Sequence, residues 1–211
     1  EIVFGLVGSE MCIRDSTDWA RPQIYLPVVN AHMPVHPVDA PHAGIGLDID
    51  YLIGSCRDEA NFFSAFMDLQ GSQFERRARQ VVAAAGVSWD DVLARYAQLR
   101  PELDTEECFN AALGDMWFRL PSLRIAQGHQ RHSKRNTYVY LFEWSSPLIG
   151  AAHALDLMVF GNGLALPFLG AFKGYEQTAT MMRKAWVAFA ASGSPQAVSY
   201  THLRAHETEY D

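Results

Sequence analysis

Several classes of protein are excluded by features that this sequence lacks. It has no uninterrupted run of about 18 apolar residues, so no membrane-spanning helix is predicted. Its formal net charge is −7 and its arginines are scattered rather than gathered in a stripe, so nucleic acid is not a predicted partner. The sequence also has no internal repeat and no low-complexity linker. These absences leave an ordinary globular domain as the expectation.

Cysteine is scarce and irregularly spaced. Cys12, Cys56 and Cys108 form neither a C-x-x-C motif nor the dense framework of a small secreted protein. We therefore predict no disulfide. The same scarcity leaves the compartment open, because it is compatible with either a cytoplasmic or a secreted protein.

The histidines form no recognisable metal-binding motif. Three of them lie in a proline-rich segment without the helical or strand geometry that would bring them together: His32, His36 and His42. His129 and His132 lie one turn apart on a predicted helix, and we expect both at its exposed polar end. The sequence therefore predicts no metal site, and nothing in it indicates a cofactor.

The two ends of the chain differ in character from its middle. Glu10–Ser16 and Val198–Thr208 resemble translated sequencing-adapter peptides, which occur on unrelated sequences. We expect residues 1–16 and 197–211 to have that origin, and residues 17–196 to carry the domain. The alternative is a genuine N-terminal strand at Ile2–Val7 and a polar C-terminal tail.

The apolar patterning of the middle predicts an α/β protein with enough hydrophobic residues, 49%, to bury a core. Two strands are predicted: a buried one over Asp48–Gly54, and a central one over Thr137–Trp144 that is rich in β-branched and aromatic residues. Between them the texture is helical from residue 62 to 132. The expected helices are 72–85 and 88–100, each capped by its serine, 105–113 capped by Thr105, 115–132 broken at Pro121, and 177–191 after the second strand.

An acid and a histidine follow the two predicted strands. Glu59 comes just after the first, and His153 follows the second, within Gly150–Leu157. Acyl transfer needs a nucleophile activated by an imidazole, with a carboxylate that holds the imidazole in the right tautomer. In α/β-hydrolases the chain order is nucleophile, acid, histidine, and Glu59 precedes His153 as that order requires. The alternatives are a solvated acid and a core or loop histidine.

The sequence around these two residues resembles type B carboxylesterases, the family of bacterial para-nitrobenzyl esterases and cholinesterases. Ile53–Glu59 resembles the strand and Asp-Glu-Gly element that carries the acid, and Gly150–Gly161 resembles the element that carries the histidine. Further similarity lies at Gly114-Asp115, Pro121, Ala126, Thr137–Tyr140 and Trp186–Ala190. The resemblance implies an incomplete α/β-hydrolase fold, with C-terminal sheet strands and packed helices, over residues 17–196. It implies Glu59 and His153 as catalytic residues.

The resemblance also implies a substrate and its surroundings. The substrate expected of the full-length protein is a small-molecule ester, and the oligomeric state stays open. Phe62 and Phe63, three and four residues after the acid, would line the substrate gorge, although core packing explains either ring equally well. The sequence departs from the family pattern at Ala60, where a glycine is usual, at Asn30-Ala31, and between Asp156 and Phe160, which is one residue short.

No G-x-S-x-G nucleophile motif occurs in the chain. We therefore expect a C-terminal fragment of a serine carboxylesterase that is inactive by itself, since its nucleophile and oxyanion hole would lie upstream. The alternative is a catalytically silent, cholinesterase-like binding or adhesion domain, in which a non-nucleophile replaces the upstream serine. In either case Glu59 and His153 should lie within hydrogen-bonding distance, about 2.6–3.2 Å.

Overall fold

The structure is a computed structural model that describes residues 29–160 and 174–196. Both adapter-like segments, and the alternative strand at 2–7, lie outside the described residues. The elements in chain order are η2 (Pro37–Asp39), η3 (Pro41–Ala43), β1 (Tyr51–Cys56), α2 (Ala60–Ser64), α3 (Gln73–Ala84), α4 (Trp89–Leu99), α5 (Thr105–Gly114), η4 (Asp115–Arg119), α6 (Leu120–His132), β2 (Thr137–Phe142), η5 (Leu155–Phe160) and α7 (Tyr175–Ser192).

The chain divides into two compact units, Glu1–Pro37 and Val38–Asp211. The described part of the first is a short turn in which the Asn30 side chain accepts hydrogen bonds from the backbone amides of His32 and Met33. The second unit holds every strand and every α-helix named above. No helix within 29–160 and 174–196 is both long and apolar enough to cross a membrane.

Strands β1 and β2 pair in parallel, with Tyr51 opposite Thr137 and Cys56 opposite Phe142. The predicted strand at 48–54 is wrong in its bounds, because pairing begins at Tyr51 and continues past the glycine to Cys56. Gly54 does not end the strand. The Tyr140 ring lies over it, and a β-carbon added at Gly54 would come within 2.5 Å of that ring.

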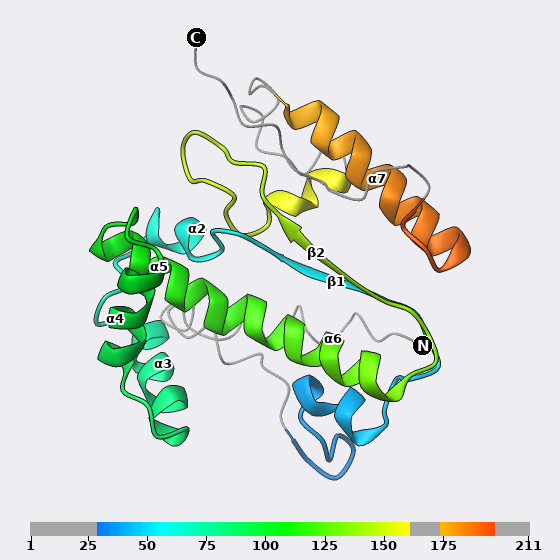
Figure 1. The fold of residues 1–211 in the computed structure, drawn as a ribbon, viewed down its shortest axis with the longest axis horizontal. Coiled ribbons are helices and arrows are strands. Elements are labelled where there is room, and N and C mark those ends of the chain that lie inside the picture. The colour runs from blue at the N-terminus through cyan, green and yellow to red at the C-terminus, as the bar shows by residue number, and fades with distance from the viewer. Residues whose placement is uncertain (1–28, 161–173, 197–211) are drawn as a thin grey trace, which may run out of the picture. The chain divides into compact units, whose positions relative to one another are not determined.

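Helices α6 and α7 cover opposite faces of the two strands (Figure 1). On one face the Phe189 and Trp186 rings of α7 meet Tyr138 and Tyr140 of β2. On the other face His129 of α6 bonds Thr137 at the start of β2. Helices on both faces of a sheet are typical of parallel α/β proteins.

The prediction that β2 is a central strand is not matched among the described residues, where β1 is its one partner. Val139 and Leu141 lie on the α6 face of β2 and are 51% and 41% exposed. Their apolar character is therefore not explained by the contacts of the described residues.

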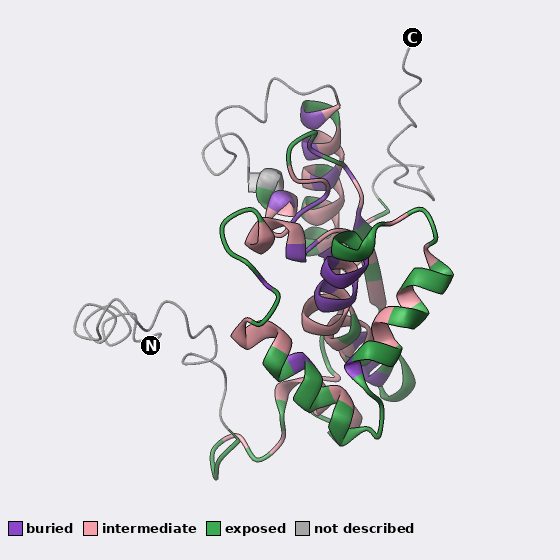
Figure 2. Cartoon of the chain, turned by 90° about the vertical axis from the view of Figure 1, so that its left-hand side faces the viewer, coloured by how far each residue is buried: buried purple, intermediate pink, exposed green. Residues whose placement is uncertain are grey.

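Two core clusters stabilise the second unit. One joins the strands to α7 and includes Phe142, Trp144, Tyr175 and Met182. The other lies among α2 to α5 and includes Trp89, Phe109 and Leu113. Buried residues gather where these elements meet, and the outward faces of the peripheral helices are exposed (Figure 2).

Local capping chemistry sets the helix starts between the strands. Ser72 and Ser88 accept hydrogen bonds from the amides of Glu75 and Asp91, so both predicted serine caps are confirmed. The predicted cap at Thr105 is wrong. Asp104 caps α5 instead and forms a reciprocal capping box with Glu107.

The predicted break at Pro121 is wrong, because the helical backbone continues through it. Residues 115–119 form the π-helical turn η4, and α6 follows directly at Leu120 with Pro121 in its first turn. The amide of Leu120 bonds the carbonyl of Asp115 in the π-helical turn, and Pro121, which has no amide to donate, comes directly after it. A π-helical turn shifts the side chains that follow it relative to the preceding helix, and such turns are frequent at functional sites.

His129 corrects the expectation that the end of α6 is exposed and polar. Its side chain is fully buried, its Nδ1 lies 2.7 Å from Thr137 Oγ1, and its ring stacks on Tyr51 with centroids 3.8 Å apart. Because β1 begins at Tyr51, the strand brings an aromatic ring against this face of α6. His132 is exposed, as predicted.

Candidate active site

Glu59 lies in the turn between β1 and α2. Its side chain is 6% exposed, and Oε1 accepts a hydrogen bond of 2.6 Å from the backbone amide of Cys56 at the end of β1. The end of β1 therefore fixes one carboxylate oxygen and leaves the other available to a second donor.

The second carboxylate oxygen faces His153. Nδ1 of His153 lies 2.7 Å from Glu59 Oε2, so the predicted contact is confirmed across 94 residues of sequence. An ionised carboxylate can only accept a hydrogen bond, so Nδ1 carries the proton and Nε2 of the neutral ring is the acceptor. The imidazole is 37% exposed. This is the tautomer that a general base needs in order to take a proton at Nε2.

Three phenylalanines surround the imidazole. The rings of Phe62 and Phe63 lie with centroids 6.1 and 5.2 Å from that of His153, so both lie beside the histidine, and their role in lining a substrate gorge stays a prediction. A third, Phe118, is closer at 4.7 Å and stacks on Phe63 at 6.1 Å. The sequence interpretation missed Phe118, because nothing in the sequence of the predicted helix 115–132 distinguishes its ring from others on that helix.

The π-helical turn that carries Phe118 is anchored to the strand end. Arg119 pairs with Asp115 at 2.6 Å and donates to the carbonyl of Arg57 at 2.9 Å. Asp115 also accepts a hydrogen bond of 2.6 Å from the Tyr96 hydroxyl. Burial, together with this bond, raises the pKa of Tyr96, so the phenol stays a neutral donor.

The backbone on either side of His153 is unusual. Ala154, with φ of 67°, is the one described non-glycine residue in the left-handed region. That conformation costs an ordinary L-residue about 1 kcal/mol or more. Gly150, three residues before the histidine, has the same φ without that cost.

Cys56 is the thiol nearest the pair in sequence, and it is poorly suited to be a nucleophile. Burial raises its pKa, and the negative charges of Asp156 and Glu59 raise it further, so the thiol stays protonated at neutral pH. The residue is 1% exposed. Cys56 and Cys108 are both free and buried, and Cys12 lies outside the described residues.

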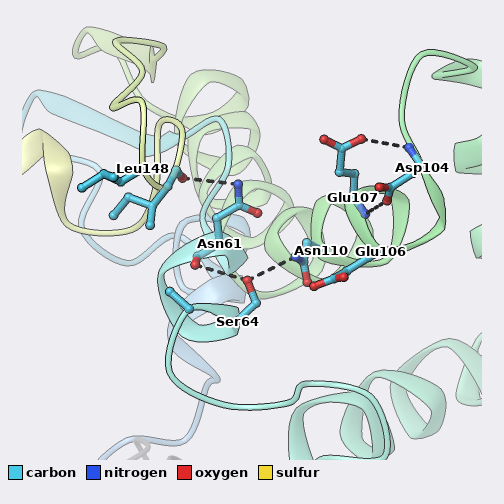
Figure 3. Close-up of a pocket in the computed structure, with 9 residues that line it drawn as sticks. Asn61, Ser64, Asp104, Glu106, Glu107, Asn110 and Leu148 are labelled. Atoms are coloured by element: carbon cyan, nitrogen blue, oxygen red, sulfur yellow. Dashed lines mark hydrogen bonds between the residues drawn. The ribbon is translucent and has the colours of Figure 1, made fainter.

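A pocket of about 320 Å³ lies between α2, the start of α5 and the loop at 148–149 (Figure 3). Its polar lining includes Asn61, Ser64 and Asn110, and Asp104, Glu106 and Glu107 make one side acidic. Neither Glu59 nor His153 lines it. Among residues 29–160 and 174–196, no three His, Cys, Asp or Glu side chains gather as metal ligands. His42 instead bonds the carbonyl of Arg124.

Known proteins resemble the chain in sequence and in fold. Residues 16–211 match the family described as "Carboxylesterase family". A phenmedipham hydrolase of Pseudarthrobacter oxydans is 28% identical in an alignment of 207 residues, which covers 92% of this chain and 40% of that protein. A carboxylesterase structure from Geobacillus stearothermophilus has a TM-score of 0.66 and 24% identity over 88% of this chain and 40% of its own. A PNB esterase structure has a TM-score of 0.58 and 26% identity, over 82% of this chain and 36% of its own.

The chain therefore spans about 40% of the length of the relatives described above. The fold is that of the carboxylesterase α/β-hydrolases in part, with two strands among the described residues. Since the family match runs to residue 211, it includes the segment 197–211, and the division of the chain at 16 and 196 stays a prediction. On the extent of the match, the chain belongs to the carboxylesterase family.

Proposed function

We propose that this chain is the acid- and histidine-bearing part of a serine carboxylesterase. The observation that carries the proposal is the buried Glu59 carboxylate, 2.7 Å from Nδ1 of a partly exposed His153. Family membership makes ester hydrolysis the reaction to which such a pair contributes.

In the reaction, the nucleophile is a serine that lies outside this chain, since no G-x-S-x-G motif occurs within it. Nε2 of His153 takes the proton from the serine hydroxyl as the oxygen attacks the ester carbonyl. Glu59 holds the ring and stabilises the imidazolium that forms. His153 then gives the proton to the leaving alcohol, and a second cycle with water releases the acid from the acyl-enzyme.

The substrate side of His153 is apolar. Phe62, Phe63 and Phe118 lie around the ring and form an aromatic wall against which the ester would pack. Such a wall favours an ester with an apolar acyl or alcohol group next to the carbonyl. It also lowers the local dielectric around the Glu59–His153 pair, which strengthens their interaction.

By itself the chain should be inactive. Loss of the nucleophile alone forfeits on the order of 10⁴-fold or more of the rate in serine hydrolases. The oxyanion-hole donors would be absent as well, which removes the residual electrostatic catalysis.

Hydrolysis of a chromogenic ester such as para-nitrophenyl acetate tests the proposal. The chain alone should show no more than the background rate, and the longer gene product should be active. His153→Ala in the longer protein should lower kcat/KM by on the order of 10⁴-fold. The exposed His132→Ala serves as the matched control and should have no effect. Near-parental activity of the His153→Ala protein would sink the assignment, and an inactive parent without an upstream serine would support a binding domain.

A further inference from the structure

Asp58, the residue before Glu59, links the turn that carries Glu59 to the segment that carries His153. Its backbone amide donates to the carbonyl of Ala151 at 2.9 Å, and its carboxylate Oδ2 accepts from the amide of Ala151 at 2.9 Å. One residue thus binds both polar backbone groups of Ala151. Ala151 and Ala152 are fully buried, and His153 follows them directly.

The Asp58 carboxylate is itself held in place. The Arg57 guanidinium binds it in a bidentate manner, with Nε to Oδ1 at 3.1 Å and Nη2 to Oδ2 at 2.9 Å. Arg57 Nη2 also donates to Ser145 Oγ at 2.6 Å. The carboxylate is therefore held in this orientation by a planar, always-charged partner.

The loop before His153 is shaped to receive this carboxylate. A β-carbon added at Gly150 would lie 2.6 Å from Asp58 Oδ2, so any larger residue there would displace the acid. Asn61 Nδ2 donates to the carbonyl of Ile149 at 3.3 Å, a second link between the same two segments (Figure 3). An antiparallel bridge between Ser146 and Gly150 closes the loop on itself.

We propose that Asp58 is a positioning residue that sets the geometry of the Glu59–His153 pair by clamping the Ala151 backbone to the turn of the acid. The inference rests on the proposed function for its catalytic consequence. Its structural consequence, the ordering of the Nδ1 hydrogen bond, can be measured in this chain without any activity. A misplacement of about 1 Å in such a pair can cost on the order of 10²-fold in rate.

Two variants break the clamp by different means. Asp58→Ala removes the acceptor, and Gly150→Ala adds a methyl group that pushes Oδ2 away. Asp58→Asn keeps an oxygen that can accept from the Ala151 amide, so it is the conservative rescue. Gly86→Ala is the matched control for Gly150→Ala: Gly86 also has positive φ, 76°, but a β-carbon there would meet nothing within 4 Å. Asp90→Ala is the control for Asp58→Ala, because it removes an exposed ion pair with Arg79.

The first readout is the downfield proton resonance of the His153 Nδ1–H in the folded chain, assigned by its loss in His153→Ala. Asp58→Ala and Gly150→Ala should broaden or abolish it, and Asp58→Asn and both controls should retain it. The second readout is kinetic: in the longer protein, Asp58→Ala and Gly150→Ala should lower kcat about 10- to 100-fold, with KM changed by less than about threefold.

The outcomes separate this inference from the proposed function. An unchanged Nδ1–H resonance and unchanged kcat in a folded Asp58→Ala protein would overturn the positioning role even if His153→Ala is inactive. If Asp58→Ala does not fold, Gly150→Ala against Gly86→Ala gives the same decision. Loss of the resonance in the clamp variants, together with full activity of His153→Ala, would leave the positioning role intact and overturn the catalytic assignment.

Discussion

Replacing Glu59 by glutamine tests how the buried carboxylate works. The carboxylate accepts two hydrogen bonds, from the Cys56 amide at 2.6 Å and from His153 Nδ1 at 2.7 Å. Glutamine has one oxygen, so it can satisfy one of these two donors only. If its oxygen faces Cys56, its NH₂ group faces the histidine, and Nδ1 must become the acceptor. If its oxygen faces the histidine, its NH₂ group opposes the Cys56 amide.

Both arrangements have measurable costs. In the second arrangement the buried Cys56 amide is left without an acceptor, which costs about 1–3 kcal/mol and should lower the free energy of unfolding of the chain by that amount. The first arrangement instead moves the histidine proton to Nε2, which then cannot accept the serine proton. Wrong-tautomer variants of serine hydrolases lose on the order of 10⁴-fold in kcat. That loss corresponds to about 5 kcal/mol of transition-state stabilisation at 1.36 kcal/mol per tenfold change.

Urea unfolding of the chain and ester hydrolysis by the longer protein measure the two effects. Glu75→Gln is the matched control, because Glu75 also accepts from one backbone amide, that of Gly71, and from one side chain, that of Arg79. It should affect stability without affecting kcat. The reasoning is refuted if Glu59→Gln keeps parental stability, the Nδ1–H resonance of His153 and a kcat within about tenfold of the parent.

Three further predictions concern the residues around the pair. Burial raises the pKa of Asp58, but the hydrogen bonds from Arg57 and Ala151 outweigh burial, and the pKa lies below its ordinary value. Asp58 should therefore stabilise the fold above about pH 4 and lose this effect on acidification. Asp58→Asn should flatten the acid limb of the curve of stability against pH, and an unchanged limb would contradict this. Ala154→Gly should relieve the left-handed φ of 67° and raise the unfolding free energy by about 1 kcal/mol in thermal or urea unfolding, where a loss of stability would be the contrary result. Because burial raises the pKa of the Cys56 thiol, iodoacetamide should modify it only in unfolding urea, as peptide mapping can detect; modification at equal rates in the native chain would contradict its burial.

Features determined by short-range chemistry were predictable from the sequence. The serine caps at Ser72 and Ser88 depend on an amide three residues away, so the local pattern is sufficient. The choice of Asp104 over Thr105 turned on a single residue, because the capping box requires Glu107 three residues after the cap.

Features that depend on distant contacts were not predictable. Gly54 ends an apolar run in the sequence, but in the fold it makes room for Tyr140, which lies 86 residues along the chain. The sequence around His129 is that of an exposed helix end, and the residue is buried because its ring stacks on that of Tyr51. Nothing local in the sequence distinguishes its ring from that of the exposed His132.

The candidate site shows the same division. Glu59 and His153 were found through motifs, and their hydrogen bond followed from the order of the strands. Phe118 was missed because it lies in a π-helical turn, and that turn is held by the hydrogen bond from Arg119 to the carbonyl of Arg57, which follows β1. The hydrogen bonds between Asp58 and Ala151 were likewise not predictable, because a backbone amide that binds a distant side chain does not determine which residue type stands at its own position.

The central claim, that Glu59 and His153 serve a serine nucleophile outside this chain, is tested most directly by labelling with a fluorophosphonate, which reacts with activated serines. The longer gene product should be labelled at one serine, in a G-x-S-x-G motif upstream of this chain. His153→Ala should slow that labelling by on the order of 10⁴-fold, and the chain alone should not be labelled. Labelling of the His153→Ala protein at the parental rate, or of a serine within this chain, would contradict the claim.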